Sequence, residues 1–239
     1  MYIVFLVILL AFFLIPTIDA LIEKKKPKGK DSVLTEKMRC KSRWQSIAFL
    51  WGGLLTVVIM CLIGKISPQD IGFRKIIFLN NHWITLVALF LFGLASAFFL
   101  YQTILPLVSA KQRAEAKKQL ADDKRAGLVN ILPRTNKERW QFAFLSLSAG
   151  VCEETLYRGF SVYILLAVFP GIPIYLVIII ISVIFGIGHF YQGMQGVITT
   201  GITGALFMCL FLAAGSLIPG IALHFLVDFS STFLLWEEK

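Results

Sequence analysis

Six ionisable residues stand inside apolar stretches of this sequence. They fall in three short motifs, CEETLYRG, FGIGHF and HFLVD, and are Glu153, Glu154, Arg158, His189, His224 and Asp228. Placing a charged side chain at the centre of a membrane helix costs about 2.5–3.5 kcal/mol. Groups of this kind therefore need partners or a chemical purpose.

Helical spacing separates the two neighbouring glutamates. Glu154 and Arg158 are four residues apart, so they lie about 40° from each other on one helix face and can form an ion pair. Glu153 is turned about 100° away from Glu154 and has no local cation. A carboxylate in that position suits general base or acid catalysis. The alternative is that all three side chains form one structural polar network.

His224 and Asp228 are also four residues apart. The carboxylate can therefore hold the imidazole in one orientation, or both groups can address a common atom. His189 follows Phe185 at the same interval. A lone histidine in a membrane helix is usually a packing residue, but two histidines and three carboxylates from separate helices indicate a site.

Composition excludes a soluble domain. The 239 residues are 57% hydrophobic and 15% charged, with a mean hydropathy of +0.78, whereas soluble domains carry about 25% charged residues. The net charge of +9 lies mainly in two blocks, 23–43 and 111–139. Because these blocks flank apolar spans, we expect cytoplasmic loops beside anionic lipid headgroups and no nucleic-acid partner. The four cysteines form no C-x-x-C pair and predict no disulfide.

The apolar stretches predict an all-α, polytopic transmembrane bundle of about seven spans, with the catalytic core in the last four. The spans lie near 2–22, 44–64, 83–105, 150–169, 172–190, 195–214 and 217–236. Placing the basic loops inside puts the N-terminus outside and the C-terminus in the cytoplasm. We expect one folded unit, with N-terminal helices and basic loops in 1–135 and a catalytic helical core in 136–239.

Local signals refine this picture. Residues 136–150 read either as an interfacial segment or as the first turns of one long helix with the fourth span. The turn 169–173 makes the fourth and fifth spans antiparallel neighbours. Glycines are frequent from Gly186 to Gly220 and predict close helix packing there.

The predicted topology raises a difficulty about depth. His189 and Glu153 fall toward the cytoplasmic side, whereas His224 begins the last span from the outer side. For them to meet, His224 must lie deeper, through helix tilt, a short sixth span, or a loop around Gly215 and Ser216 that dips into the bundle.

The three motifs occur in the order E-E-x-x-x-R, F-x-x-x-H and H-x-x-x-D on successive apolar segments. This series resembles the CPBP family of intramembrane proteases, which includes type II CAAX prenyl endopeptidases and bacteriocin-processing or self-immunity (Abi-type) proteins. The resemblance covers roughly Leu145 to Ser231. It implies a multi-pass endopeptidase, expected in a bacterial plasma membrane, whose peptide or protein substrate is membrane-associated and in some members lipidated.

The resemblance also implies roles for the individual residues. Glu153 would activate a water for attack on a peptide carbonyl, and His189 would share that water. His224 and Asp228 would orient the water or stabilise the oxyanion, while Glu154 and Arg158 support the scaffold or hold the substrate.

Asp228 departs from the family pattern, in which many members carry Asn. An ionised Asp cannot donate a hydrogen bond to an oxyanion, so this residue favours orienting His224 or ligating a metal. His189, His224 and Asp228 are the candidate ligands for zinc, although no H-E-x-x-H helix is present. We leave zinc open and predict no other cofactor.

Two other functions remain open from the sequence. A proton-linked transporter would use the acids and histidines as a relay, and a non-catalytic scaffold or immunity protein would keep the fold only to bind a partner. A Glu153→Gln change would abolish flux in the first, be tolerated in the second, and leave an uncut substrate for a protease.

Overall fold

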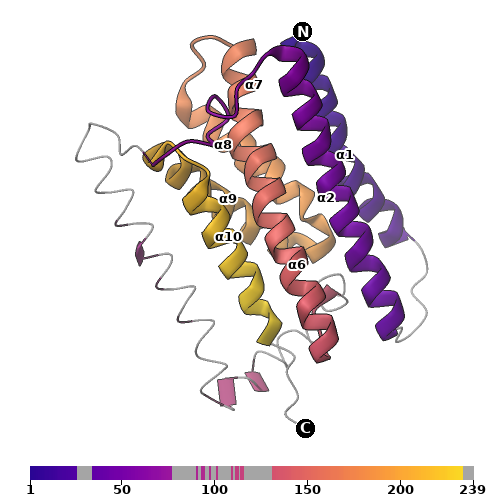
Figure 1. Cartoon of the computed structure of the whole chain (residues 1–239). Coiled ribbons are helices and arrows are strands. Elements are labelled where there is room, and N and C mark those ends of the chain that lie inside the picture. Colours follow the sequence, from indigo (N-terminus) through magenta and orange to yellow (C-terminus); the bar gives the residue numbers. More distant parts are fainter. Residues whose placement is uncertain are drawn as a thin grey trace.

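The computed structural model describes residues 1–25, 34–76 and 131–233, together with scattered positions between 90 and 115. These residues form helices and no strands, which agrees with the predicted all-α class. The helices run side by side as an upright bundle (Figure 1). They are α1 (Tyr2–Lys25), α2 (Glu36–Gly64), α6 (Asn136–Glu153), η1 (Glu154–Phe160), α7 (Ser161–Val168), α8 (Ile174–Gly188), η2 (Phe190–Gln192), α9 (Gly193–Ala214), α10 (Ile218–Ser230) and η3 (Ser231–Phe233).

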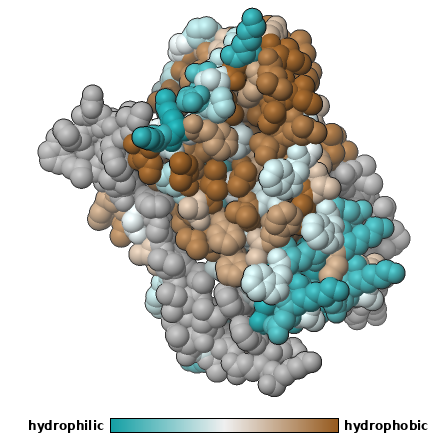
Figure 2. Space-filling view, in the orientation of Figure 1, coloured by the Kyte–Doolittle hydropathy of each residue, from teal (hydrophilic) through white to brown (hydrophobic). Residues whose placement is uncertain are grey.

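Two helices in the described part of the chain are long and apolar enough to cross a membrane. They are Glu36–Gly64 and Phe190–Ala214, and shorter apolar helices cover Tyr2–Ile15, Ile174–Gly188 and Ile218–Ser230. The predicted third span, 83–105, lies largely outside the described residues. Seven spans therefore stay a prediction, while Figure 2 shows the apolar surface that covers much of the described helices.

α6, η1 and α7 form one continuous helix from Asn136 to Val168. Its start is fixed by a capping box, in which Thr135 accepts from the Glu138 N–H and the Glu138 carboxylate accepts from the Thr135 N–H. Of the two readings of residues 136–150, the one with a single long helix is confirmed.

The middle of this long helix is wound as a π-helix over Glu154–Phe160. The hydroxyl of Ser161 donates to the carbonyl of Leu156, five residues earlier, at 2.7 Å. π-Helical turns hold an extra residue and occur frequently at functional sites. All seven residues of this segment are buried, so the widened turn faces neighbouring helices on every side.

Glycine allows α8 and α9 to pack closely, as the sequence predicts. A Cβ atom added at Gly186 would lie 2.6 Å from the carbonyl oxygen of Val197 and 3.2 Å from the Cα of Gly201. Because no side chain fits at Gly186, this is the point where the two backbones meet.

The turn between α9 and α10 is buried inside the molecule. Ser216 is 0% and Leu217 1% exposed. The segment 65–76, which follows α2 and is the purple loop near the top of Figure 1, packs against them. The Leu217 N–H donates to the carbonyl of Gly72 at 3.0 Å, and the Ser216 hydroxyl donates to the carbonyl of Arg74 at 2.7 Å. The turn before α10 is therefore fixed to the segment that follows α2.

A buried ion-pair cluster joins the first turns of α2 and α6. Glu138 accepts from Arg39 at 2.8 Å and from Arg43 at 2.9 Å, and its side chain is 0% exposed. Burial alone would raise the pKa of Glu138, but the hydrogen bonds from both arginines and from the Arg134 N–H outweigh it and lower its pKa to about 2. The cluster fixes the start of α6 against α2.

Candidate active site

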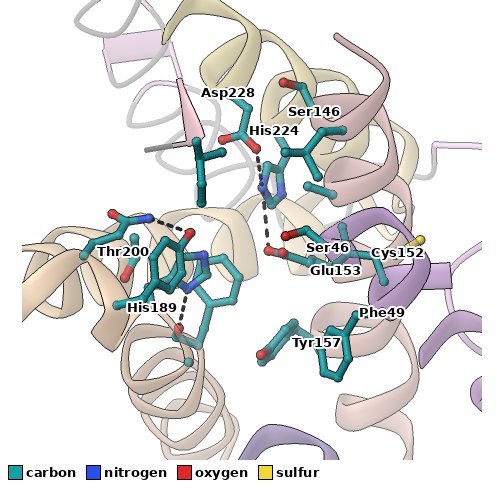
Figure 3. A pocket seen from close by; sticks show the side chains of 18 of the residues that line it. Ser46, Phe49, Ser146, Cys152, Glu153, Tyr157, His189, Thr200, His224 and Asp228 are labelled. Carbon is teal, nitrogen blue, oxygen red and sulfur yellow. Dashed lines mark hydrogen bonds and ion pairs between the residues drawn. The ribbon is translucent and has the colours of Figure 1, made fainter. Parts of the chain in front are cut away.

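The polar residues of the three motifs converge between α6, η1, α8 and α10. Glu153 is the last residue of α6, and His224 lies in the middle of α10. The His224 Nε2 atom is 3.8 Å from Glu153 Oε2 and 3.7 Å from Asp228 Oδ2. Figure 3 shows this imidazole between the two carboxylates.

α10 places His224 beside the end of α6, so the two motifs meet as the site requires. Gly150 makes the approach close, since a Cβ there would lie 3.0 Å from the carbonyl oxygen of Ile221. The depth of His224 in the membrane stays a prediction.

Glu154 links the other side of His224 to Arg158. The His224 Nδ1–H donates to Glu154 Oε1 at 2.9 Å, and Arg158 Nη1 lies 3.1 Å from the same oxygen. The Glu154–Arg158 pair predicted from helical spacing is confirmed. It is not self-contained, however, because Glu154 also fixes the orientation of the imidazole.

Arg158 is fully buried and has no direct place on the cavity wall. Its guanidinium carbon lies 4.3 Å from the ring centre of Phe185 and 5.5 Å from that of Phe207, and Nη2 donates to the carbonyl of Gly204 at 3.3 Å. The aromatic faces and the Glu154 carboxylate together compensate this charge.

Glu153 has different surroundings from Glu154. Its side chain is 17% exposed, and among the described residues no Lys or Arg lies within ion-pair distance of it. Its Oε2 atom is buried without a hydrogen-bond partner. This oxygen faces His224, and the exposed part of the side chain borders the cavity, where Figure 3 shows Glu153 at the centre.

His189 ends α8 and is fixed by its own helix. Its Nδ1–H donates to the carbonyl of Phe185 at 2.8 Å, since a carbonyl only accepts. In the neutral ring the lone pair is then on Nε2. Figure 3 shows the imidazole on the opposite side of the cavity from Cys152, with Glu153 between them.

These side chains border a cavity of about 670 Å³. Most of its wall is apolar, and the walls come from α1, α2, α6, η1, α8, η2, α9 and α10. The aromatic and aliphatic members nearest the N-terminus are Phe12, Ile15, Phe49 and Leu50. Four of the six predicted site residues line this cavity, namely Glu153, His189, His224 and Asp228, while Glu154 and Arg158 lie behind them.

A comparison with protein-family models matches residues 135–230 to the family described as type II CAAX prenyl endopeptidase Rce1-like. Residues 135–230 of the chain are thus similar to this family. The match begins at the N-cap of α6 and ends with α10, so it contains all six polar residues of the site. No curated protein and no solved structure matches the chain.

The description of the matched family is that of an endopeptidase. The matched range lies inside the predicted catalytic core, 136–239, apart from Thr135. α1 and α2 lie outside the match, yet both contribute side chains to the wall of the same cavity.

Several residues of this site were not predicted from the sequence. Tyr157 lies four residues after Glu153 and also borders the cavity, so helical spacing alone could have identified it. Gln45 and Ser46 are polar residues near the start of an apolar span, which was a usable signal. Tyr191 and Gln192 lie two and three residues after His189 and gave no signal, because a helix was expected to end there.

The three candidate zinc ligands do not fit a metal site. In the described ranges no group of three His, Cys, Asp or Glu side chains is arranged to hold a metal ion. We therefore derive no step through a metal.

Proposed function

We propose that this chain is an intramembrane endopeptidase that hydrolyses a peptide bond in a membrane-associated substrate of the CAAX type. The observation that carries the proposal is the Glu153 carboxylate, which has no Lys or Arg partner among the described residues and faces a cavity that it shares with two imidazoles. A carboxylate and an imidazole around one water form a general-base arrangement.

In the proposed reaction Glu153 accepts a proton from a water that also donates to Nε2 of His189. The water oxygen then bonds to the carbonyl carbon of the substrate, and the C=O electron pair moves onto the carbonyl oxygen. As the C–N bond breaks, Glu153 returns the proton to the leaving nitrogen.

His224 would position Glu153 and Asp228 in this scheme. Its Nδ1–H is fixed by Glu154 at 2.9 Å, and Glu154 is fixed by Arg158 at 3.1 Å. The chain of contacts from Arg158 to Glu153 supports a site that changes little during the reaction, which favours catalysis.

The apolar wall supports a lipidated substrate. Phe12 and Ile15 of α1 and Phe49 and Leu50 of α2 stand on the cavity wall together with Glu153. A purely polar leader peptide would leave these side chains without apolar contacts, so a substrate with an apolar chain next to the scissile bond fits better.

We also propose that the end of the bundle where α2 and α6 begin faces the cytoplasm and rests on anionic lipid headgroups. Lys37, Lys41 and Lys137 are exposed there, and Trp44 and Trp140, 55% and 81% exposed, stand one to two turns further along the helices. Figure 2 shows a hydrophilic patch at this end. Basic residues followed by tryptophan are typical of a membrane interface.

The test of the protease proposal is Glu153→Gln. We expect peptide cleavage to fall by about 10²–10⁴-fold, because the general base is lost, while the midpoint of thermal unfolding in detergent stays unchanged. Cleavage is measured on the purified protein with an internally quenched peptide that carries a farnesylated CAAX terminus. Glu36→Gln, at an exposed carboxylate in the first turn of α2, is the control and should keep full activity.

A second measurement widens the test to other substrates. Membranes that contain the wild type or the Glu153→Gln variant are compared for new peptide termini. If neither assay detects a cleavage that depends on Glu153, the protease proposal is wrong, and proton flux in proteoliposomes becomes the next measurement.

A further inference from the structure

The proposed reaction requires a donor for the oxyanion, and the charges in the cavity limit where that donor lies. His224 Nε2 faces Glu153 at 3.8 Å and Asp228 at 3.7 Å. An oxyanion placed on this side would approach two carboxylates, and an ionised Asp228 cannot donate to it. The negative charge should therefore develop on the side of the cavity away from this pair.

Several hydroxyl groups on the wall are already committed. The Thr200 hydroxyl donates to the carbonyl of Gly196 at 2.8 Å, the Thr203 hydroxyl to Thr199 at 2.9 Å, and the Ser146 hydroxyl to Phe142 at 3.0 Å. Each of these protons would have to leave a backbone carbonyl before it could serve a substrate.

Tyr191 is arranged differently. Its hydroxyl oxygen accepts a hydrogen bond from Gln192 Nε2 at 3.0 Å, so one lone pair is occupied and the O–H proton remains available. Its ring centre is 5.8 Å from that of His189, and both residues border the cavity. Tyr191 thus carries a donor on a ring that lies beside the imidazole proposed to hold the water.

The backbone fixes this arrangement. Tyr191 lies in the short helix η2 directly after His189, and Gly193 turns the chain into α9 with φ +82°. Gln192 folds over Gly196, where an added Cβ would lie 2.3 Å from the Gln192 Cβ. Glycine at 196 leaves the space in which the Gln192 amide reaches Tyr191.

We propose that Tyr191 is a further catalytic residue, whose hydroxyl, oriented by Gln192, donates to the oxyanion that forms when water attacks the substrate carbonyl. The inference rests on the proposed function. In this step the new C–O bond displaces the C=O electron pair onto oxygen, and the Tyr191 O–H stabilises that charge without transferring its proton.

The deciding variant is Tyr191→Phe, assayed in the full-length protein with the farnesylated quenched peptide. We expect kcat to fall by about 100-fold, as for the loss of one oxyanion donor, and KM to stay within about twofold, because the bond strengthens only in the transition state. Tyr175→Phe, at an exposed tyrosine of α8 that is not on the cavity wall, is the matched control and should keep full activity.

The division of the defect between kcat and KM gives an independent readout. Loss of an oxyanion donor lowers kcat and leaves KM nearly unchanged, whereas loss of a substrate contact raises KM. A Tyr191→Phe defect that lies wholly in KM would assign the hydroxyl to substrate binding and overturn the proposal.

Tyr157 is the competing donor, since its hydroxyl also reaches the cavity. The proposal is wrong if Tyr157→Phe lowers kcat while Tyr191→Phe keeps the wild-type value. If the wild type itself cleaves no peptide, both the proposed function and this inference are wrong. An active wild type with an unimpaired Tyr191→Phe variant removes the inference alone.

Discussion

Glu153 and Glu154 are adjacent in the sequence but meet opposite surroundings. Glu154 is buried between Arg158 and His224, whereas the Glu153 side chain is 17% exposed and borders the cavity, with no Lys or Arg within ion-pair distance among the described residues. Substitution of Glu153 should therefore lower cleavage alone, whereas substitution of Glu154 should lower both cleavage and stability.

Glu154→Gln should lower cleavage and stability together. The amide can still accept from His224, but Arg158 loses its charged partner in a buried place, which costs about 3–5 kcal/mol. Chemical unfolding in detergent measures the loss, with Glu153→Gln as the matched comparison at the neighbouring position. Equal stability of the two variants would contradict the role given to Glu154.

The motif residues could be selected from the sequence because ionisable groups are costly in apolar helices. Spacing was sufficient for the Glu154–Arg158 pair, which involves one helix. It was not sufficient for the bond between Glu154 and His224, because residues 70 positions apart meet only through tertiary packing.

At the level of helices, the approach of α8 to α9 positions His189. His189 directly follows α8, and a Cβ at Gly186 would lie 2.6 Å from a backbone oxygen of α9. Gly201, on the facing helix, has more room, with 3.6 Å to its nearest neighbour.

Gly186→Ala should therefore push the two helices apart and cost about 1–3 kcal/mol, with a loss of cleavage because His189 moves. Gly201→Ala is the matched control at the same contact and should be tolerated, since its Cβ makes ordinary contacts and alanine favours the helix. Thermal unfolding and peptide cleavage of both variants test whether the close contact of α8 and α9 at Gly186 is required. If Gly186→Ala is as stable and active as the wild type, the close approach is not required.

Helix positions followed from apolar stretches, but two features that build the site did not. The π-helical winding of η1 depends on burial against neighbours on all sides, for which a single sequence carries no periodic signal. The position of α10 depends on hydrogen bonds from Ser216 and Leu217 to the segment after α2, some 140 residues earlier.

For the molecule as a whole, the Glu138 cluster joins the N-terminal helices to the matched family segment. The pKa of Glu138 falls from 4.5 to about 2, so its ionised form is favoured by folding. The stabilisation is therefore complete above pH 4.5 and is lost as the pH falls toward 2.

Glu138→Gln should lower the free energy of unfolding by about 3 kcal/mol at pH 7, because Arg39 and Arg43 lose their buried carboxylate. The difference in free energy of unfolding between the variant and the wild type should shrink as the pH is lowered through 4.5. Unfolding in detergent between pH 7 and pH 3 measures it. If this difference in free energy of unfolding does not depend on pH, the charge of the Glu138 carboxylate does not stabilise the contact between the helices.

The proposed contact with anionic headgroups makes a prediction for the bilayer. Wild-type protein should unfold at a higher temperature in nanodiscs of phosphatidylglycerol than in phosphatidylcholine, and added salt should reduce the difference. Replacing Lys37, Lys41 and Lys137 by Gln should remove most of it. If the difference in unfolding temperature between the two lipids persists in added salt and in the triple variant, the contact with lipid headgroups lies elsewhere on the protein.

The packing of α10 against earlier parts of the chain also has a consequence for biosynthesis. His224 and Asp228 are made after every other described part of the site, and α10 settles against Gly150, Glu154 and Gly72, which are already in place. Before α10 is made, the nascent chain holds four of its six polar site residues, and both groups on α10 are missing. We therefore expect the proposed activity to begin only after α10 has packed into the bundle.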